Sequence, residues 1–166
     1  MYNIGDKIFY PMHGAGVVEA IDEKNVFGKV MTYYCLKMPV GEMNLMIPVD
    51  NIEQTGLRDV ITREEAMGII GKMPGLEVPV CENWNKRYRD NLVLLKSGDI
   101  LEVAQVVKML LLRERERSLS TGERKMLMSA KNILISEIVL AAGMEKEEAE
   151  LLIEEGIFQT VQATAD

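Results

Sequence analysis

The residues best suited to bind a charged partner lie near the middle of the chain, where the only tryptophan, Trp84, precedes the cationic side chains of Lys86, Arg87 and Arg89. An aromatic ring beside cations can act as an apolar wedge between base pairs while the cations hold phosphates, as in proteins that bind the DNA minor groove. Trp84 can also be a half-buried cap on a helix end, because large aromatic rings normally pack inward. The apolar helical row is expected to begin only at Tyr88. The residues alone leave both interpretations open.

The distribution of charge favours this segment as the part that contacts an anionic partner. The whole chain has a net charge of −7, but residues 82–131 carry 11 lysines and arginines against 7 acidic residues, a local charge of +4. Residues 1–81 and 132–166 have local charges of −4 and −7. A segment of +4 neutralises few phosphates, and non-specific affinity for DNA grows with the number neutralised. We therefore expect a second, tethering contact if DNA is the target.

No set of side chains in the sequence predicts an enzyme, a metal site or a cofactor. The single histidine, His13, lies in a turn segment without clustered cysteines or carboxylates. The two cysteines, Cys35 and Cys81, are far apart and form neither a disulfide framework nor a zinc motif. We expect a non-enzymatic protein with no catalytic residues, no bound metal and no cofactor.

The sequence shows no targeting or membrane-spanning signal. The first residues lack the succession of basic, apolar and small residues that marks a secretory signal. No apolar run approaches the roughly 20 residues that cross a bilayer. We therefore expect a cytoplasmic protein without a membrane partner.

The first part of the chain has the pattern of β structure. Four or five short strands within about 60 residues are typical of a small Tudor-like or SH3-like antiparallel β-barrel. Such a barrel buries too little surface to be stable without support from the next segment of the chain. Runs rich in Val, Ile, Tyr and Met predict strands at Lys7–Tyr10, Gly16–Ile21, Val30–Lys37 and Asn44–Pro48. Turn-forming residues predict connecting loops at Pro11–Ala15, Asp22–Lys29 and Met38–Met43.

From Thr62 onward the apolar spacing is helical, and each predicted helix has a start signal. The fold class is therefore α+β, with an all-α C-terminal domain after the small barrel. The predicted N-caps are Thr62, Asn83, Asp99 and Ser120, and the predicted ends lie near Gly71, Ser97, Arg117 and Gly143, before a last short helix at about Glu145–Glu155. We expect a barrel domain at residues 1–60, a short helix and linker at 61–82, and a helical domain at 83–160.

One predicted strand has apolar residues on both faces. Leu45, Met46 and Ile47 are consecutive and precede Pro48, and successive side chains of a strand point to opposite faces. At least one of them must face outward, and the strand edge could add to the sheet of a partner. In the alternative, the helix predicted from Thr62 covers this segment. The exposed edge also leaves the oligomeric state open between a monomer and a dimer formed by strand pairing or domain exchange.

Several motifs occur in order between residue 4 and about residue 140. They are Gly5–Val18, Tyr34–Lys37, Ile47–Asn51, Gly56–Arg58, Asn83–Tyr88, Ser97–Asp99 and Leu119–Leu127. Together they resemble the CarD family of bacterial transcription regulators that bind RNA polymerase. A similar module occurs in transcription-repair coupling factors, but this chain has no helicase motifs, so the resemblance does not extend to that activity.

The resemblance implies that the C-terminal helical domain contacts promoter DNA and stabilises the open complex. In the family, a tryptophan enters the minor groove at the upstream edge of the transcription bubble, and nearby basic residues hold the backbone. Trp84 matches the wedge and Lys86 and Arg89 match the phosphate contacts. Arg87 is expected as a further helper.

The resemblance also implies that the N-terminal Tudor-like domain binds the β subunit of RNA polymerase. The loop after the second strand places Lys24 at a contacting position, and the fourth strand places Met46 at another. Some members have arginine where this chain has Met46, so an apolar contact would replace a salt bridge here. Leu45, Ile47 and Pro48 complete the expected polymerase-binding surface.

A second function is compatible with the same features. In it, the protein is an adaptor that does not bind DNA and joins RNA polymerase to a second protein through an apolar patch around Trp84. Charge reversal at Lys86 and Arg89 separates the two functions, because only DNA binding requires these cations.

Overall fold

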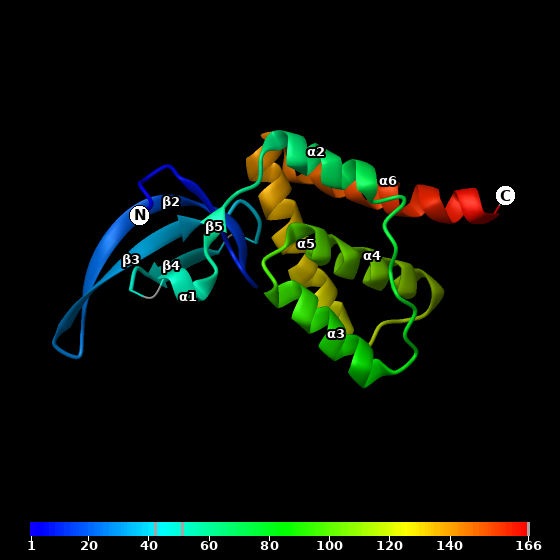
Figure 1. The fold of residues 1–166 in the computed structure, drawn as a ribbon, viewed down its shortest axis with the longest axis horizontal. Helices are drawn as coiled ribbons and strands as arrows, with labels where there is room; N and C mark the ends of the chain where they lie inside the picture. Colours follow the sequence, from blue (N-terminus) through cyan, green and yellow to red (C-terminus); the bar gives the residue numbers. More distant parts are fainter. Residues whose placement is uncertain (42, 51, 166) are drawn as a thin grey trace.

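The chain folds into a sheet followed by a bundle of helices, as the change in apolar periodicity predicts (Figure 1). The computed structural model describes residues 1–41, 43–50 and 52–165, with side chains described as far as Phe158. The strands lie on one side of the molecule and the long helices on the other (Figure 1). The prediction of an α+β fold with a C-terminal helical part is confirmed.

The strands form one antiparallel sheet with two different faces. Ile8 lies in a core formed within the sheet, together with Tyr34 and Ile47, whereas its neighbour Phe9 packs into the core of the helices. This follows from the alternation of side chains along a strand. The strand order is β4-β3-β2-β1-β5, with β1 at Lys7–Tyr10, β2 at Gly14–Val26, β3 at Lys29–Lys37, β4 at Asn44–Pro48 and β5 at Arg58–Asp59.

The β2–β3 hairpin is longer than the sequence predicts. Strand pairing continues through most of the expected loop at Asp22–Lys29. Only Phe27 and Gly28 form the turn, and their φ angles of 52° and 80° are both positive, as in the two-residue turns that match the twist of a sheet. Lys24 therefore lies within β2 and not in a loop. The prediction failed here because the projecting ribbon has no buried face, so its residues do not alternate between apolar and polar.

The helices begin where the capping residues predict. The N-cap side chains of Thr62, Asn83, Asp99 and Ser120 each accept a hydrogen bond from a backbone N–H in the first turn. At Thr62, the side chain of Glu65 returns the bond and completes a capping box. The helices are α1 at Ile52–Thr55, α2 at Arg63–Lys72, α3 at Trp84–Lys96, α4 at Ile100–Glu116, α5 at Thr121–Ala142 and α6 at Lys146–Ala165.

The ends of the helices agree less well with prediction. Gly143 ends α5 as expected, in the left-handed conformation with φ 66°. However, α6 continues well past the predicted segment at Glu145–Glu155. Neither α1 nor β5 was predicted, because four and two residues are too few to show a periodicity.

Helix α5 is the central element of the helical part. It packs against α2, α4 and α6 and also against β2. Helix α2 lies on α5 and α6 (Figure 1), so it does not cover Leu45–Pro48 as the alternative for that strand proposed. The division of the chain at residues 60 and 82 stays a prediction. No single helix of the described residues is long and apolar enough to cross a bilayer, and α5 with Lys146–Phe158 passes that test only as a pair bent by 116°.

Polar contacts join the sheet to α5. Arg58 of β5 donates two hydrogen bonds to the Glu137 carboxylate, with N–O distances of 2.6 and 2.8 Å. Its guanidinium carbon also lies 4.0 Å from the ring centre of Phe9. The backbone N–H of Ala15 in β2 donates to Ser136 Oγ at 2.9 Å. These contacts link residues 79 and 121 positions apart and hold the sheet and helices in one arrangement.

Strand β2 approaches α5 most closely at Gly14. Its φ is +109°, and a Cβ placed there would lie 2.7 Å from Ser136 Oγ and 3.3 Å from the Cα of Ile133. Any other residue would therefore be strained in its backbone and would push the two elements apart. Glycine at this position sets the spacing between the sheet and the helices.

Candidate nucleic-acid interface

Trp84 is the first residue of α3 and is 41% exposed. Its indole stacks on Tyr88, with ring centres 5.1 Å apart and planes inclined by 16°. Its Nε1–H donates to Ser120 Oγ at 2.9 Å. The tryptophan is therefore neither buried in the core nor free in solvent. One part of the ring packs against the protein, and another part is open to a partner.

The position of Trp84 extends the inward-facing row of α3. Tyr88, Asn91 and Leu95 lie on that face, and Trp84 lies one helical turn before Tyr88. The expectation that the row begins only at Tyr88 needs correction. At this end of α3 the indole meets the N-cap of α5 rather than a second helix face, which leaves it partly uncovered.

Lys86 and Arg89 lie on the outer side of α3. At 3.6 residues per turn they leave the helix roughly 140–200° around from Trp84. The Nζ of Lys86 lies 3.0 Å from Asp90 Oδ2, and this hydrogen bond raises the pKa of Lys86. Arg89 Nε donates to Asn85 O over a long 3.4 Å. Both cations are exposed, so phosphates can reach them along the outer face of α3.

Arg87 points in the opposite direction and is only 3% exposed. Its Nε and Nη2 donate to Glu123 at 2.7 and 2.9 Å, and its Nη1 donates to Cys81 O at 2.8 Å. The hydrogen bonds between the two side chains raise the pKa of Arg87 and lower the pKa of Glu123. The expectation that Arg87 helps to hold phosphates needs correction. Its guanidinium is buried and its donors are used within the protein, because the position three residues after Trp84 lies on the inward-facing side of α3.

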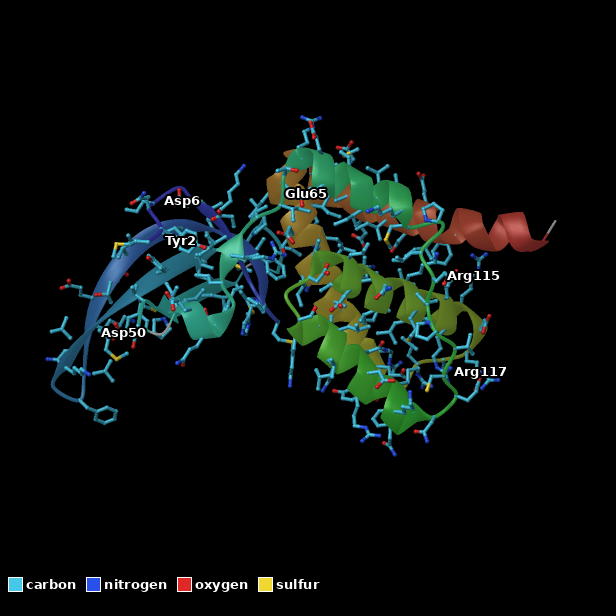
Figure 2. All side chains as sticks on the ribbon, viewed as in Figure 1. Tyr2, Asp6, Asp50, Glu65, Arg115 and Arg117 are labelled. Carbon is cyan, nitrogen blue, oxygen red and sulfur yellow. The ribbon has the colours of Figure 1, made fainter. Side chains whose placement is uncertain are left out.

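The end of α4 lies near the start of α3. Arg117 follows α4, and its Nη1 lies 3.6 Å from Glu82 Oε2, just before α3 (Figure 2). Both side chains are well exposed, at 66% and 70%, so this pair is weak. Arg115 instead lies over the ring of Phe158, 4.8 Å from its centre. Of these two arginines, Arg117 is therefore the one near the Trp84 segment.

On the sheet, the two residues that the family resemblance assigns to a polymerase contact lie next to each other. Lys24 of β2 and Met46 of β4 face outward on either side of β3, with Lys24 Nζ 3.4 Å from Met46 Sδ. Both are exposed, and Met46 is 40% exposed. Strand β4 is at the edge of the sheet, so its outer backbone edge is available next to Met46.

The other candidate residues of β4 divide between the two faces. Ile47 is fully buried in the sheet core, so the expectation that it forms part of a binding surface needs correction. Leu45 packs against the same core and is partly buried, as is Pro48. The run of apolar residues could not show which side faces out, whereas the paired strand leaves Met46 as the outward residue.

The remaining candidates for chemistry are held in packing contacts. His13 stacks on Tyr10 with ring centres 4.5 Å apart, and burial lowers the pKa of His13. The Cys35 thiol lies 3.2 Å from Asp22 Oδ2, and burial raises its pKa. Within the described residues, no three His, Cys, Asp or Glu side chains form a group that could hold a metal ion.

Sequence reasoning missed the residues that surround Trp84 and Arg87. Ser120 was predicted as an N-cap, and it does accept the Glu123 N–H at 3.2 Å. The Glu123 carboxylate, however, bonds to Arg87. A glutamate at this position was the available signal, but a partner 36 residues away is not visible from local spacing.

Two protein-family models match this chain. One is described as the CarD-like/TRCF RID domain and matches residues 2–61, and the other, the CarD C-terminal domain, matches residues 72–154. A Bacillus subtilis (strain 168) protein named "Putative transcription factor YdeB" is 37% identical over 153 residues, which cover 89% of this chain and 97% of the relative. The chain belongs to the CarD family. It is therefore a CarD-like transcription factor, and this class is generally non-enzymatic.

The two segments matched by the CarD family models coincide with the sheet and with the helical part of the chain. The RID match covers the sheet from β1 to β5, and the C-terminal match covers α3, α4, α5 and the first part of α6. Lys24 and Met46 lie in the first match. Trp84, Lys86 and Arg89 lie in the second. The two candidate surfaces thus belong to different modules of the family.

Proposed function

We propose that this protein binds the β subunit of RNA polymerase through its sheet and contacts promoter DNA through its helices, so that it stabilises the open complex. The observation that carries the proposal is the half-exposed indole of Trp84 at the end of α3, with exposed cations on the same helix. This is the combination of apolar wedge and phosphate contacts that minor-groove proteins use.

The DNA contact would lie at the upstream edge of the transcription bubble. Insertion of a side chain between base pairs costs a few kcal/mol per step in lost stacking. DNA that is already melting offers steps where this cost is lowest. Lys86 and Arg89 leave α3 on the side away from Trp84, so they would bind backbone phosphates that flank the inserted ring. The exposed Lys86–Asp90 pair would not prevent this, because such pairs contribute little stability.

The polymerase contact compensates for weak DNA binding. A segment of +4 is a poor DNA ligand alone, but anchoring the sheet makes the second contact intramolecular, at an effective concentration of roughly millimolar. Lys24, Met46 and the edge of β4 form the surface that would bind the polymerase. The contacts of Arg58 and Ala15 with α5 favour a stiff connection between the two surfaces.

The test is the lifetime of an open complex on an unstable promoter, challenged with competitor DNA. Trp84→Ala should leave polymerase binding intact and return the lifetime toward that without the protein. Val93→Ala is the matched control, because Val93 is another exposed apolar residue of α3, at 67% exposure. Equal lifetimes for wild type and Trp84→Ala, with polymerase bound in both, would contradict the wedge.

The adaptor function remains the competing proposal, because the stacked Trp84–Tyr88 pair could also bind an apolar surface of a protein. Reversing Lys86 and Arg89 to glutamate separates the two. Loss of promoter protection by the double variant supports DNA binding. Full protection by the double variant, with Trp84→Ala still defective, supports the adaptor.

A further inference from the structure

The only polar group of the Trp84 side chain is already bonded within the protein. An indole has one donor, Nε1–H, and no acceptor. In this structure that donor is bonded to Ser120 Oγ at 2.9 Å. The same oxygen accepts the backbone N–H of Glu123 at 3.2 Å. Ser120 therefore caps α5 and holds the indole with the same atom.

The surrounding contacts keep this bond in place. The Arg87–Glu123 pair connects α3 to α5 within one helical turn of Trp84 and of Ser120, at 2.7 and 2.9 Å and almost without exposure. Gly122 lies against both rings, since a Cβ there would be in ordinary van der Waals contact, 3.6 Å from Cζ2 of Trp84 and 3.7 Å from Cε2 of Tyr88. The edge of the indole that carries Nε1 and Cζ2 thus faces the first turn of α5, and its flat side lies on Tyr88.

We propose that Ser120 is a positioning residue that holds Trp84 in its wedge orientation before DNA is bound. This inference rests on the proposed function. Fixing the ring in advance removes an ordering cost from the binding step, which is the general benefit of a preorganised contact. It also leaves the indole without a free donor for a base edge. The wedge would then act by stacking and would not distinguish bases by hydrogen bonds.

Ser120 also has a structural role as an N-cap, so the test must separate the two roles. A second residue offers that separation, because Trp84→Phe keeps an aromatic ring but lacks the N–H that bonds to Ser120. If Ser120 acts through the indole, Ser120→Ala should shorten the open-complex lifetime about fivefold in the wild-type background, the effect of one net hydrogen bond. In the Trp84→Phe background it should add nothing.

The experiment uses the full chain with RNA polymerase on an unstable promoter. It compares wild type, Ser120→Ala, Ser120→Thr, Trp84→Phe and the double variant Ser120→Ala/Trp84→Phe. Ser120→Thr keeps the hydroxyl and should restore the lifetime. Thr62→Ala is the matched control, because it removes the N-cap of α2, away from Trp84, and should leave the lifetime unchanged.

A second readout needs neither DNA nor polymerase. Trp84 is the only tryptophan, so the fluorescence anisotropy of the free protein reports on this ring alone. Ser120→Ala should lower the anisotropy, Ser120→Thr should restore it and Thr62→Ala should not change it. Unchanged anisotropy in Ser120→Ala would overturn the positioning role, whatever the DNA assays show.

Failure of this inference is distinguishable from failure of the proposed function. If Trp84→Ala shortens the lifetime but Ser120→Ala does not, the wedge stands and the positioning role is overturned. The same holds if Ser120→Ala shortens the lifetime equally in the Trp84→Phe background, because capping alone then explains its effect. If Trp84→Ala has no effect, the proposed function fails first.

Discussion

Two arginine–glutamate pairs hold this molecule together in different surroundings. Arg87–Glu123 joins α3 to α5, and both side chains are almost fully buried, at 3% and 2% exposure. Arg58–Glu137 joins the sheet to α5, and there the glutamate is fully buried whereas the arginine is 29% exposed. The same bidentate chemistry thus serves inside the helical core and at a junction that water reaches from one side.

The difference teaches that burial sets the consequence of losing a partner. Moving an ion from water into a protein costs several kcal/mol, and a buried pair recovers this only through its mutual hydrogen bonds. At the junction, water can partly replace the arginine. We therefore expect the buried pair to affect stability most, and the junction pair to affect the arrangement of sheet and helices.

The largest expected effect is that of Arg87→Ala. It leaves the Glu123 carboxylate buried without its partner, and the free energy of unfolding should fall by about 3–5 kcal/mol. Urea unfolding followed by circular dichroism measures this. The control is Arg87→Met with Glu123→Leu, which removes both charges and should recover much of the loss. Equal stability of the single and double variants would show that the unpaired charge is not the cause.

A smaller loss of about 2–4 kcal/mol is expected for Arg58→Ala, because water enters the space beside Glu137. The sheet and helices should also stop unfolding together, since Arg58 contacts Phe9 of the sheet and Glu137 of α5. Hydrogen–deuterium exchange resolved by segment shows whether the two parts open separately. Arg63→Ala, an exposed arginine at the start of α2, is the control. A single cooperative opening in Arg58→Ala would argue against the junction role.

The pH dependence of stability should distinguish Glu123→Gln from wild type. The hydrogen bond from Arg87 lowers the pKa of Glu123 below its ordinary 4.5, so the stabilisation is complete above that value and is lost as pH falls through the folded-state pKa. Wild type should therefore be more stable than Glu123→Gln by about 1.5–3 kcal/mol at pH 7. The gap should close in acid. Thermal unfolding between pH 7 and pH 3 tests this, and a gap that widens in acid would contradict it.

The smallest effect on stability is expected for Lys86→Ala, which should leave the free energy of unfolding unchanged within error, because its pair with Asp90 is exposed. Its effect should appear in DNA binding instead. If Lys86 binds a phosphate, its loss should reduce the slope of log affinity against log salt by about one unit. Promoter binding by the polymerase complex at several salt concentrations measures this slope. Lys96→Ala, at the other end of α3, should leave the slope unchanged.

Local signals predicted much of this fold because each depends on residues close together. Thr62, Asn83, Asp99 and Ser120 are N-caps in the structure, since a cap needs only its own first turn. The β2–β3 hairpin was predicted too short because its projecting end has no core to impose alternation on the sequence. Elements with a buried face can therefore be predicted from the sequence pattern, whereas exposed ribbons cannot.

The candidate site was harder to predict because its residues meet across long separations. The types Trp, Lys and Arg indicated a DNA contact, but the sequence could not show that Arg87 faces Glu123, 36 residues away. Nor could a run of apolar residues show that Met46 faces out and Ile47 faces in. Whether a residue faces the core or the solvent depends on the helix or strand that packs against its element.

A further contact of Arg58 bears on how the protein would select its DNA. Its Nε donates to Gly98 O at 2.9 Å, directly after the C-terminal end of α3. Helix α3 then extends away from the junction for 13 residues, so Trp84 at its other end lies roughly 20 Å further along the helix axis. If the sheet binds RNA polymerase as proposed, α3 would hold Trp84 at a fixed distance from the polymerase. The base pairs that the protein acts on would then be chosen by their distance from the enzyme and not by their sequence.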